Sequence, residues 1–373
     1  MAKRGNAVFG MMVVLLLAFS AAGCDKIGKK EKDGEKFERG SSGLEMEFVQ
    51  NYPQQKFLIS NEDENILVAI NVRNFGTYPT KTSKLERSGE EVIFGAGKIY
   101  LSGFDDRIID IGKKSIGLSD LFLQPASEIN PKGGLDTAEF EGEIIADKII
   151  VDKYEPTILA TACYPYFTKA SPTVCIDPFP FEQREEKVCQ IGSTTLTSQG
   201  APIAVTKVEQ EAATRKIQFK IHIKNVGTGD VIWDKDALTG GEKAIGGKEG
   251  LLNRCSPLGG GILDRKDFDR VQVESIMIGE DDMLKNGECS PFADGTNNVV
   301  RLFNGEGFII CTYNVPQDTQ TTYTTPLNIE LRYAYRSTIS KPITISKLAT
   351  IETREDTTKP MGEDDFGVVQ ENV

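Results

Sequence analysis

The sequence has 373 residues, a net charge of −12 at pH 7 and an isoelectric point near 4.9. Proteins that bind nucleic acid need clustered Lys and Arg against the phosphates, so we expect no nucleic-acid partner for this acidic chain. The only histidine is His222, which nearly excludes His-based catalytic triads and three-histidine zinc sites.

Residues 1–24 have the three parts of a secretory signal. Lys3 and Arg4 precede an apolar run that begins at Ala7, and small residues then lead to Cys24. The run holds about 16 residues, which is short for a helix that must cross roughly 30 Å of hydrocarbon. We therefore expect an exported protein.

The end of this signal, Ala21-Ala22-Gly23-Cys24, resembles the lipobox of prokaryotic lipoproteins. The resemblance implies cleavage before Cys24 and a lipid on that cysteine, although the family more often has leucine where this chain has Ala21. It predicts a protein anchored to the membrane on its extracytoplasmic face, at the cell surface or in the periplasm. An uncleaved membrane anchor and plain secretion are the alternatives.

Residues 25–42 carry six basic and five acidic side chains and almost nothing apolar. Such a segment cannot bury enough surface to offset its ordering entropy, so it predicts a flexible linker between membrane and folded body. The acidic residues 348–373 are interpreted in the same way, as a disordered tail.

A short motif occurs twice in the body of the chain. Val72-Arg73-Asn74-Phe75-Gly76-Thr77 returns 151 residues later as Ile223-Lys224-Asn225-Val226-Gly227-Thr228. Each copy ends a segment in which apolar and polar residues alternate, as in a strand with one buried face. The Asn-x-Gly favours a turn at the strand end.

The later part of each copy shows a second correspondence. Pro156 and Pro172 have the same spacing as Pro326 and Pro342, and alternating residues follow the first proline of each pair. This pattern predicts that each unit ends in a hairpin. The second unit is longer, and its Gly-rich segment 239–261 is interpreted as a surface loop that faces a partner.

Many short alternating segments separated by turn residues predict an all-β fold, with two tandem β-sandwich domains over residues 43–178 and 189–347. The strand that ends in Val/Ile-Arg/Lys-Asn-x-Gly, with a late strand after Asn304-Gly305, resembles the immunoglobulin-like (CARDB-type) adhesion modules of prokaryotic surface proteins. This resemblance implies a non-enzymatic binding, adhesion or structural role. Trp233 falls where a core tryptophan of such a module could lie.

Six cysteines remain if Cys24 carries a lipid, and an exported chain is expected to pair them as three disulfides: Cys163, Cys175, Cys189, Cys255, Cys289 and Cys311. On the two arms of the expected hairpin, Cys163 would face Cys175. Pairing Cys289 with Cys311 closes the shorter loop and leaves Cys189 with Cys255.

No catalytic, cofactor-binding or metal-binding constellation is found in the sequence, and we expect a non-enzyme without a cofactor. A surface hydrolase with paired carboxylates is one alternative, with candidates at Asp105 and Asp106, at Asp230, Asp234 and Asp236, and at Asp281 and Asp282. The second group could also hold calcium, but it lacks the EF-hand order of ligands. An accessory subunit of a cell-envelope transport or secretion complex is the other alternative.

Overall fold

The computed structural model describes residues 40–79, 97–184, 187–233, 250, 254–259, 263–286, 288–293 and 298–348, and the backbone of 83–87 and 90–94. The signal, Cys24, almost all of the linker, most of the Gly-rich segment and the tail after Leu348 lie outside these residues. The described residues form strands and three short 3-10 turns, and Arg254 and Cys255 have helical backbone. No helix in this part of the chain is long and apolar enough to span a membrane.

The first half of the body, residues 43–178, contributes a four-stranded antiparallel sheet in the order β1-β3-β9-β7. Its strands are β1 (Leu44–Phe48), β3 (Glu64–Asn74), β9 (Leu135–Ile144) and β7 (Ile109–Ile111). Ile66, Val68, Ile70 and Val72 of β3 are all buried, because successive side chains of a strand point to opposite faces and these share one.

The second half, residues 189–347, contributes a five-stranded antiparallel sheet in the order β13-β14-β15-β21-β19. Its strands are β13 (Ser193–Thr195), β14 (Ile203–Ala213), β15 (Lys216–Asn225), β21 (Glu306–Asn314) and β19 (Cys289–Ser290). The alternation predicted for β15 is confirmed, since Ile217, Phe219, Ile221 and Ile223 are buried.

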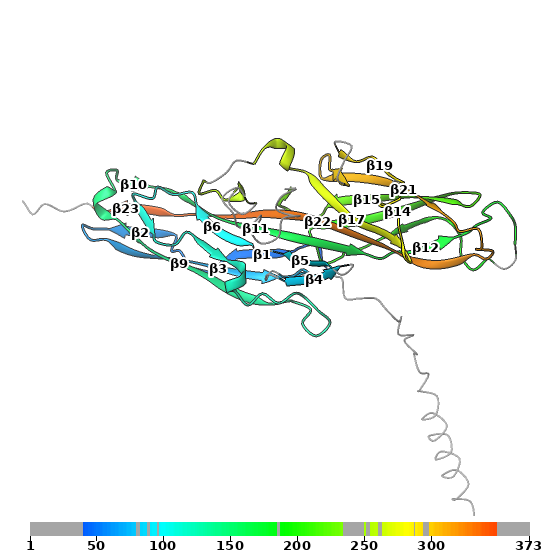
Figure 1. The fold of residues 1–373 in the computed structure, drawn as a ribbon. Helices are drawn as coiled ribbons and strands as arrows, with labels where there is room; N and C mark the ends of the chain where they lie inside the picture. The colour runs from blue at the N-terminus through cyan, green and yellow to red at the C-terminus, as the bar shows by residue number, and fades with distance from the viewer. Residues whose placement is uncertain are drawn as a thin grey trace, which may run out of the picture. The chain divides into compact units, whose positions relative to one another are not determined.

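A nine-stranded sheet takes strands from both halves, in the order β18-β17-β22-β11-β6-β8 with β12, β16 and β20 paired beside this path. Its main strands are β11 (Thr157–Ala170), β22 (Tyr323–Pro342), β6 (Lys98–Ser102), β8 (Ser115–Gly117), β17 (Arg270–Ile278) and β18 (Asp281–Asp282). The shorter additions are β12 (Thr173–Ile176), β16 (Asp230–Ile232) and β20 (Val299–Arg301). Figure 1 shows β11 and β22, from the two halves, side by side.

One antiparallel register joins the two halves along this sheet. Thr157 faces Pro342 and Ala170 faces Ile329 in the β11–β22 ladder. The register continues into β12, where Ile176 faces Tyr323, and into β10 (Lys153–Tyr154), where Lys153 faces Ser346 of β23 (Thr344–Lys347). We call this continuous pairing the seam.

The predicted hairpins at the ends of the two units are wrong. Strand β11 runs straight through Tyr164 and Lys169, which the hairpin would place in its turn, and β12 pairs with β22 instead of returning along β11. In the second half, β23 pairs in parallel with β2 (Lys56–Ile59) of the first half. The described residues of both halves belong to one compact unit, while their division into two immunoglobulin-like domains stays a prediction.

Candidate functional site

Four buried tyrosines lie at the centre of the seam: Tyr164, Tyr166, Tyr333 and Tyr335. Tyr164 faces Tyr335 and Tyr166 faces Tyr333 across the ladder, with ring centroids 6.1 and 6.2 Å apart. Burial raises the pKa of all four phenols, because the ionised form would lose its hydration. This tyrosine cluster is thus neutral and structural.

The hydroxyls of the tyrosine cluster accept backbone hydrogen bonds at matching places in the two halves. Tyr164 accepts from Leu44 N–H, at the start of β1, and Tyr333 accepts from Ile203 N–H, at the start of β14. Both N–H groups are buried, and each points away from the strand with which its own strand is paired, so it would otherwise lack a hydrogen-bond partner. The cluster therefore fixes the outer sheets to the shared sheet.

The other two hydroxyls hold the Asn-x-Gly turns. Tyr166 accepts from Tyr78 N–H at 3.4 Å and Tyr335 accepts from Gly229 N–H at 2.6 Å. Within each turn the Asn side chain accepts from the N–H two residues on and donates to the carbonyl four residues on, for Asn74 as for Asn225. The predicted turn is thus present at both copies.

All six body cysteines form pairs, as predicted, but two of the predicted pairings are wrong. Cys163 bonds Cys255, Cys175 bonds Cys189, and Cys289 bonds Cys311. The last pairing is confirmed, since Cys289 and Cys311 face each other across β19 and β21. The pairing of Cys163 with Cys175 fails because no hairpin brings β11 and β12 together.

The disulfide from Cys163 lies on the face of the shared sheet opposite the tyrosine cluster. There Cys163 and Cys255 pack with Tyr100, Ile232 and Ala334 in a small separate core. Residues 254–259 belong to the segment interpreted above as a partner-facing loop. Cys255 is 3% exposed, so this part of the segment is fastened to the sheet.

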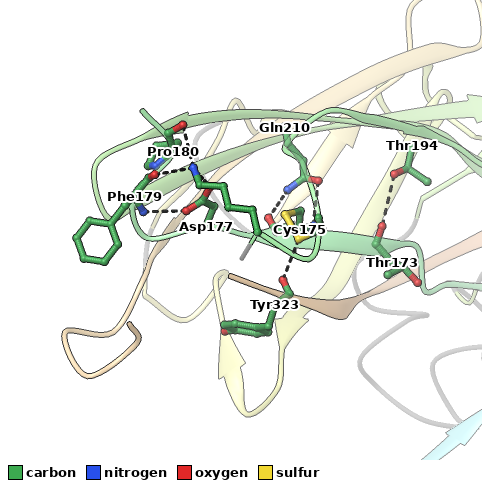
Figure 2. The surroundings of a disulfide bond; sticks show 10 residues. Thr173, Cys175, Asp177, Phe179, Pro180, Thr194, Gln210 and Tyr323 are labelled. Carbon is green, nitrogen blue, oxygen red and sulfur yellow. Dashed lines mark hydrogen bonds and ion pairs between the residues drawn. A yellow bond between two sulfur atoms is a disulfide. The ribbon is translucent and has the colours of Figure 1, made fainter. Parts of the chain in front are cut away.

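The disulfide of Cys175 and Cys189 fastens the connection between the halves. Figure 2 shows Gln210 of β14 reaching the backbone of Cys175, where its amide donates to the carbonyl and accepts from the N–H. Close by, Lys187 forms a largely buried ion pair with Asp177 at 2.8 Å and donates to the carbonyl of Phe179. The connection between residues 178 and 189, where the domain boundary is predicted, is therefore held by a disulfide and an ion pair.

Of the carboxylates considered for a hydrolase, Asp105, Asp106 and Asp230 each form a separate ion pair. Asp105 pairs with Arg107, whose hydrogen bond lowers the pKa of Asp105 to about 2, and Asp106 pairs with Lys114. Asp230 pairs with Arg336 at 2.7 Å. Asp281 and Asp282 form the short strand β18, while Asp234 and Asp236 lie outside the described residues. No group of three or more His, Cys, Asp or Glu in the described ranges is arranged to hold a metal ion.

Trp233 is only partly buried, and its indole N–H donates to Gln272 at 3.4 Å. His222 lies 3.6 Å from Glu209 on the polar side of β15, partly exposed. Neither residue lines the groove beside β20 and β21.

An aromatic groove of about 470 Å³ lies beside β20 and β21, and we take it as the candidate binding site. The side chains that give it its character are Arg270, Phe292, Arg301, Phe303, Glu306 and Phe308. Phe303 is 67% exposed and Phe308 is 42% exposed. Exposed aromatic rings gathered in a hollow are typical of interaction sites.

A tight turn positions these rings. Asn304 and Gly305 both have positive φ angles, 53° and 79°, as a two-residue hairpin turn requires. Phe303 donates to and accepts from the backbone of Glu306 across this turn. The sequence predicted the turn, but it carried no signal that the turn would expose Phe303.

The charges of the aromatic groove are mainly positive, in contrast to the acidic chain. The guanidinium of Arg301 lies 4.9 Å from the ring centroid of Phe303, and Lys220 lies at the same distance from that of Phe308. Glu306 is paired with Lys224, whose hydrogen bond lowers the pKa of Glu306. The groove can therefore hold an apolar group next to a negative one.

The sequence matches no protein-family model and no curated protein.

Proposed function

We propose that this chain is a membrane-tethered, extracytoplasmic surface protein that works by binding rather than by catalysis. The observation that carries the proposal is the pairing of all six body cysteines, because structural disulfides persist in oxidising compartments outside the cytosol. The signal-like residues 1–24 and the lipobox resemblance at Cys24 support the same location.

The binding role is assigned to the aromatic groove. A flat surface of solvated charges would contribute little binding free energy. Phe303 and Phe308, in contrast, present apolar surface in a hollow that already excludes part of the water. The partner that suits this surface is a protein of the cell envelope with an apolar side chain beside an acidic one.

The equivalent contacts at Asn74 and Asn225, and at Tyr164 and Tyr333, support an origin of the two halves from one duplicated module. We infer that this module is of the immunoglobulin-like type. The two modules then share one sheet instead of standing apart on a linker.

Mass spectrometry of the mature N-terminus tests the anchor. A lipid-modified Cys24 is expected, and Cys24→Ala should release the protein or block its processing. An intact Met1 in the membrane fraction would refute the lipid anchor and favour an uncleaved membrane anchor. Alkylation without reduction should leave the six body cysteines unlabelled.

Site-specific photo-crosslinking in intact cells tests the binding role. A photoreactive residue at position 303 should give a defined adduct, while one at Phe181, which is exposed outside the groove, serves as the matched control. Equal adducts at both positions would refute the groove as the binding surface. An adduct with a transporter or secretion component would favour the accessory-subunit alternative.

A further inference from the structure

Strand β3 has an open edge in the first half of the molecule. On one side it pairs with β9 from Glu64 to Arg73. On the other side it pairs with β1 only from Ile70 to Asn74, and one further hydrogen bond joins Val49 N–H to the carbonyl of Ala69. Residues 64–68 therefore have a strand partner on one side only.

Two backbone units face this open edge. In an antiparallel sheet the N–H and C=O of one residue point to the same side, and the side alternates along the strand. Because the carbonyl of Ala69 points toward β1, the N–H and C=O of Leu67 and Asn65 point the same way. Beyond Val49, no described strand lies on this side to receive them. Asn65 is exposed and Leu67 is partly exposed.

The second half of the molecule fills the same position with its own chain. There β14 pairs with β15 along the whole strand, and Glu211 faces Gln218 while Ala213 faces Lys216. With Asn74 aligned on Asn225, Gln218 and Lys216 correspond to Leu67 and Asn65. Residues 210–213 thus occupy the place that stands empty beside residues 65–68.

The edge is open because the first half sends its chain elsewhere. After Val49 the backbone turns sharply at Asn51, which has a φ angle of 64°, and passes to β2, where it pairs with β23. A hollow of about 410 Å³ lies between this departing segment and the edge. It is lined by Tyr52, Gln54 and Phe57 of this segment, by Asn65 and Leu67 of β3, and by Glu141 of the neighbouring strand β9.

We propose that this edge accepts an extended peptide segment of a partner protein, which adds to the sheet antiparallel to β3. The N–H and C=O groups of Leu67 and Asn65 offer it up to four main-chain hydrogen bonds, as in other cases of strand addition. Its core-facing side chains are small and apolar, because the neighbouring Ile66 and Val68 are buried and the second half has Ala212 at this level. Tyr52, 46% exposed, covers the other side of the added strand.

The segment with Tyr52, which lines the hollow beside the edge, favours one added strand over a second copy of the chain. Edge-to-edge pairing of two copies requires two folded sheets to approach side by side, and the segment with Tyr52 stands beside the edge in both. This site is separate from the aromatic groove, so the failure of either proposal leaves the other standing.

Amide hydrogen exchange on the full chain tests the premise. In the free protein the amides of Asn65 and Leu67 should exchange rapidly, while those of Ile66 and Val68, bonded to β9, should be protected. Protection of all four in dilute protein would overturn the proposal, because the edge would already be covered. Protection that grows with protein concentration would also overturn it, in favour of self-association.

The ligand probe is a phage-displayed library of random nonapeptides, selected on the full chain. Peptides with small apolar residues at alternate positions should be enriched, and they should protect Asn65 and Leu67 from exchange. Leu67→Pro removes only the N–H that faces the open edge, a place where proline is tolerated in sheets. It should weaken binding by about tenfold, the value of one main-chain hydrogen bond.

The matched control is Leu67→Ala, which shortens the side chain and keeps the N–H, and it should bind within about threefold of the original chain. Equal binding to the proline and alanine variants, or no enrichment, would refute the site. If Leu67→Pro fails to fold, Asn65→Pro replaces it, and the exchange measurement on the original chain remains decisive.

Discussion

The two halves meet at the seam through the same contacts and differ at their outer edges. In the second half β14 runs along all of β15, whereas in the first half β1 ends after five residues and its chain crosses to β23. In the first half the chain leaves β3 after a short β1 and forms β2, which pairs with β23 of the second half. The contacts of the seam therefore constrain the central strands of each half, while the strands at the outer edges can differ.

The largest expected effect is alkaline unfolding of the seam. The pKa of each tyrosine in the cluster is raised in the folded state above the unfolded value of about 10, so the stability is fully present below pH 10 and lost as the pH rises. Four such groups should lower the free energy of unfolding by about 5 kcal/mol per pH unit above that point.

Chemical denaturation at a series of pH values between neutral and strongly alkaline measures this slope. Tyr164→Phe in the first half and Tyr333→Phe in the second should each reduce the pH slope that is due to the cluster by about a quarter. Unequal reductions of the slope would contradict the equivalence of the two tyrosines.

The next effect concerns the same two tyrosines as packing units. Tyr164→Ala and Tyr333→Ala should each lower the free energy of unfolding by about 3–5 kcal/mol, because each removes a fully buried ring and leaves a backbone N–H without its acceptor. Equilibrium unfolding in urea gives both values. A loss below about 1 kcal/mol for either would contradict the equivalence of the halves.

The disulfides should rank by the separation of their cysteines. Replacing both cysteines by alanine should cost roughly 4–5 kcal/mol for Cys163 and Cys255, 92 residues apart, and roughly 3 kcal/mol for Cys289 and Cys311, 22 residues apart. The first crosses between the halves and the second lies within one. Thermal unfolding of the two double variants compares them, and the reverse order would contradict the ranking.

A smaller difference is expected at the Asn-x-Gly turns. Each side chain makes three hydrogen bonds, but Asn74 is fully buried while Asn225 is partly exposed to water. Asn74→Ala should therefore cost about 2–3 kcal/mol and Asn225→Ala about 1 kcal/mol, as measured by denaturant unfolding. Equal costs would mean that water does not replace the lost bonds of Asn225.

The smallest effect on stability is expected in the aromatic groove, which belongs to the second half alone. Phe303→Ala should change the free energy of unfolding by no more than about 0.5 kcal/mol, because the ring is mostly exposed. Binding of the envelope partner should be lost. Phe181→Ala provides the control, and a large loss of stability in Phe303→Ala alone would assign the ring to the fold instead.

Much of the strand content could be predicted from alternation, because burial of one face leaves a period of two in the sequence. The alternating segments that end at Asn74 and Asn225 are predicted as strands, and in the structure they are the strands β3 and β15. Alternation says which face of a strand is buried, but it does not name the neighbouring strand. The pairing of β11 with β22 was therefore missed, and the wrong hairpins and wrong disulfides followed from that.

One signal for the seam was present in the sequence. Tyr164-Pro165-Tyr166 and Tyr333-Ala334-Tyr335 are two Tyr-x-Tyr segments, and Pro165 faces Ala334 at the middle of the ladder. Matching prolines alone misaligned the halves by one residue, which would turn every side chain to the other face. The aromatic groove left no such trace, because Phe292 and Phe303, which both line it, lie on separate segments of the chain.

The register of the seam also has a consequence for the order in which the chain can fold. Its partners are far apart in sequence: Ile176 faces Tyr323 and Lys153 faces Ser346. A chain delivered N-terminus first holds β11 beside β6 but without β22 until nearly the whole body has arrived, and contacts of such long range form slowly. Passage in an unfolded state, as the proposed extracytoplasmic location requires, would suit this topology, because the seam cannot form until β22 has been delivered.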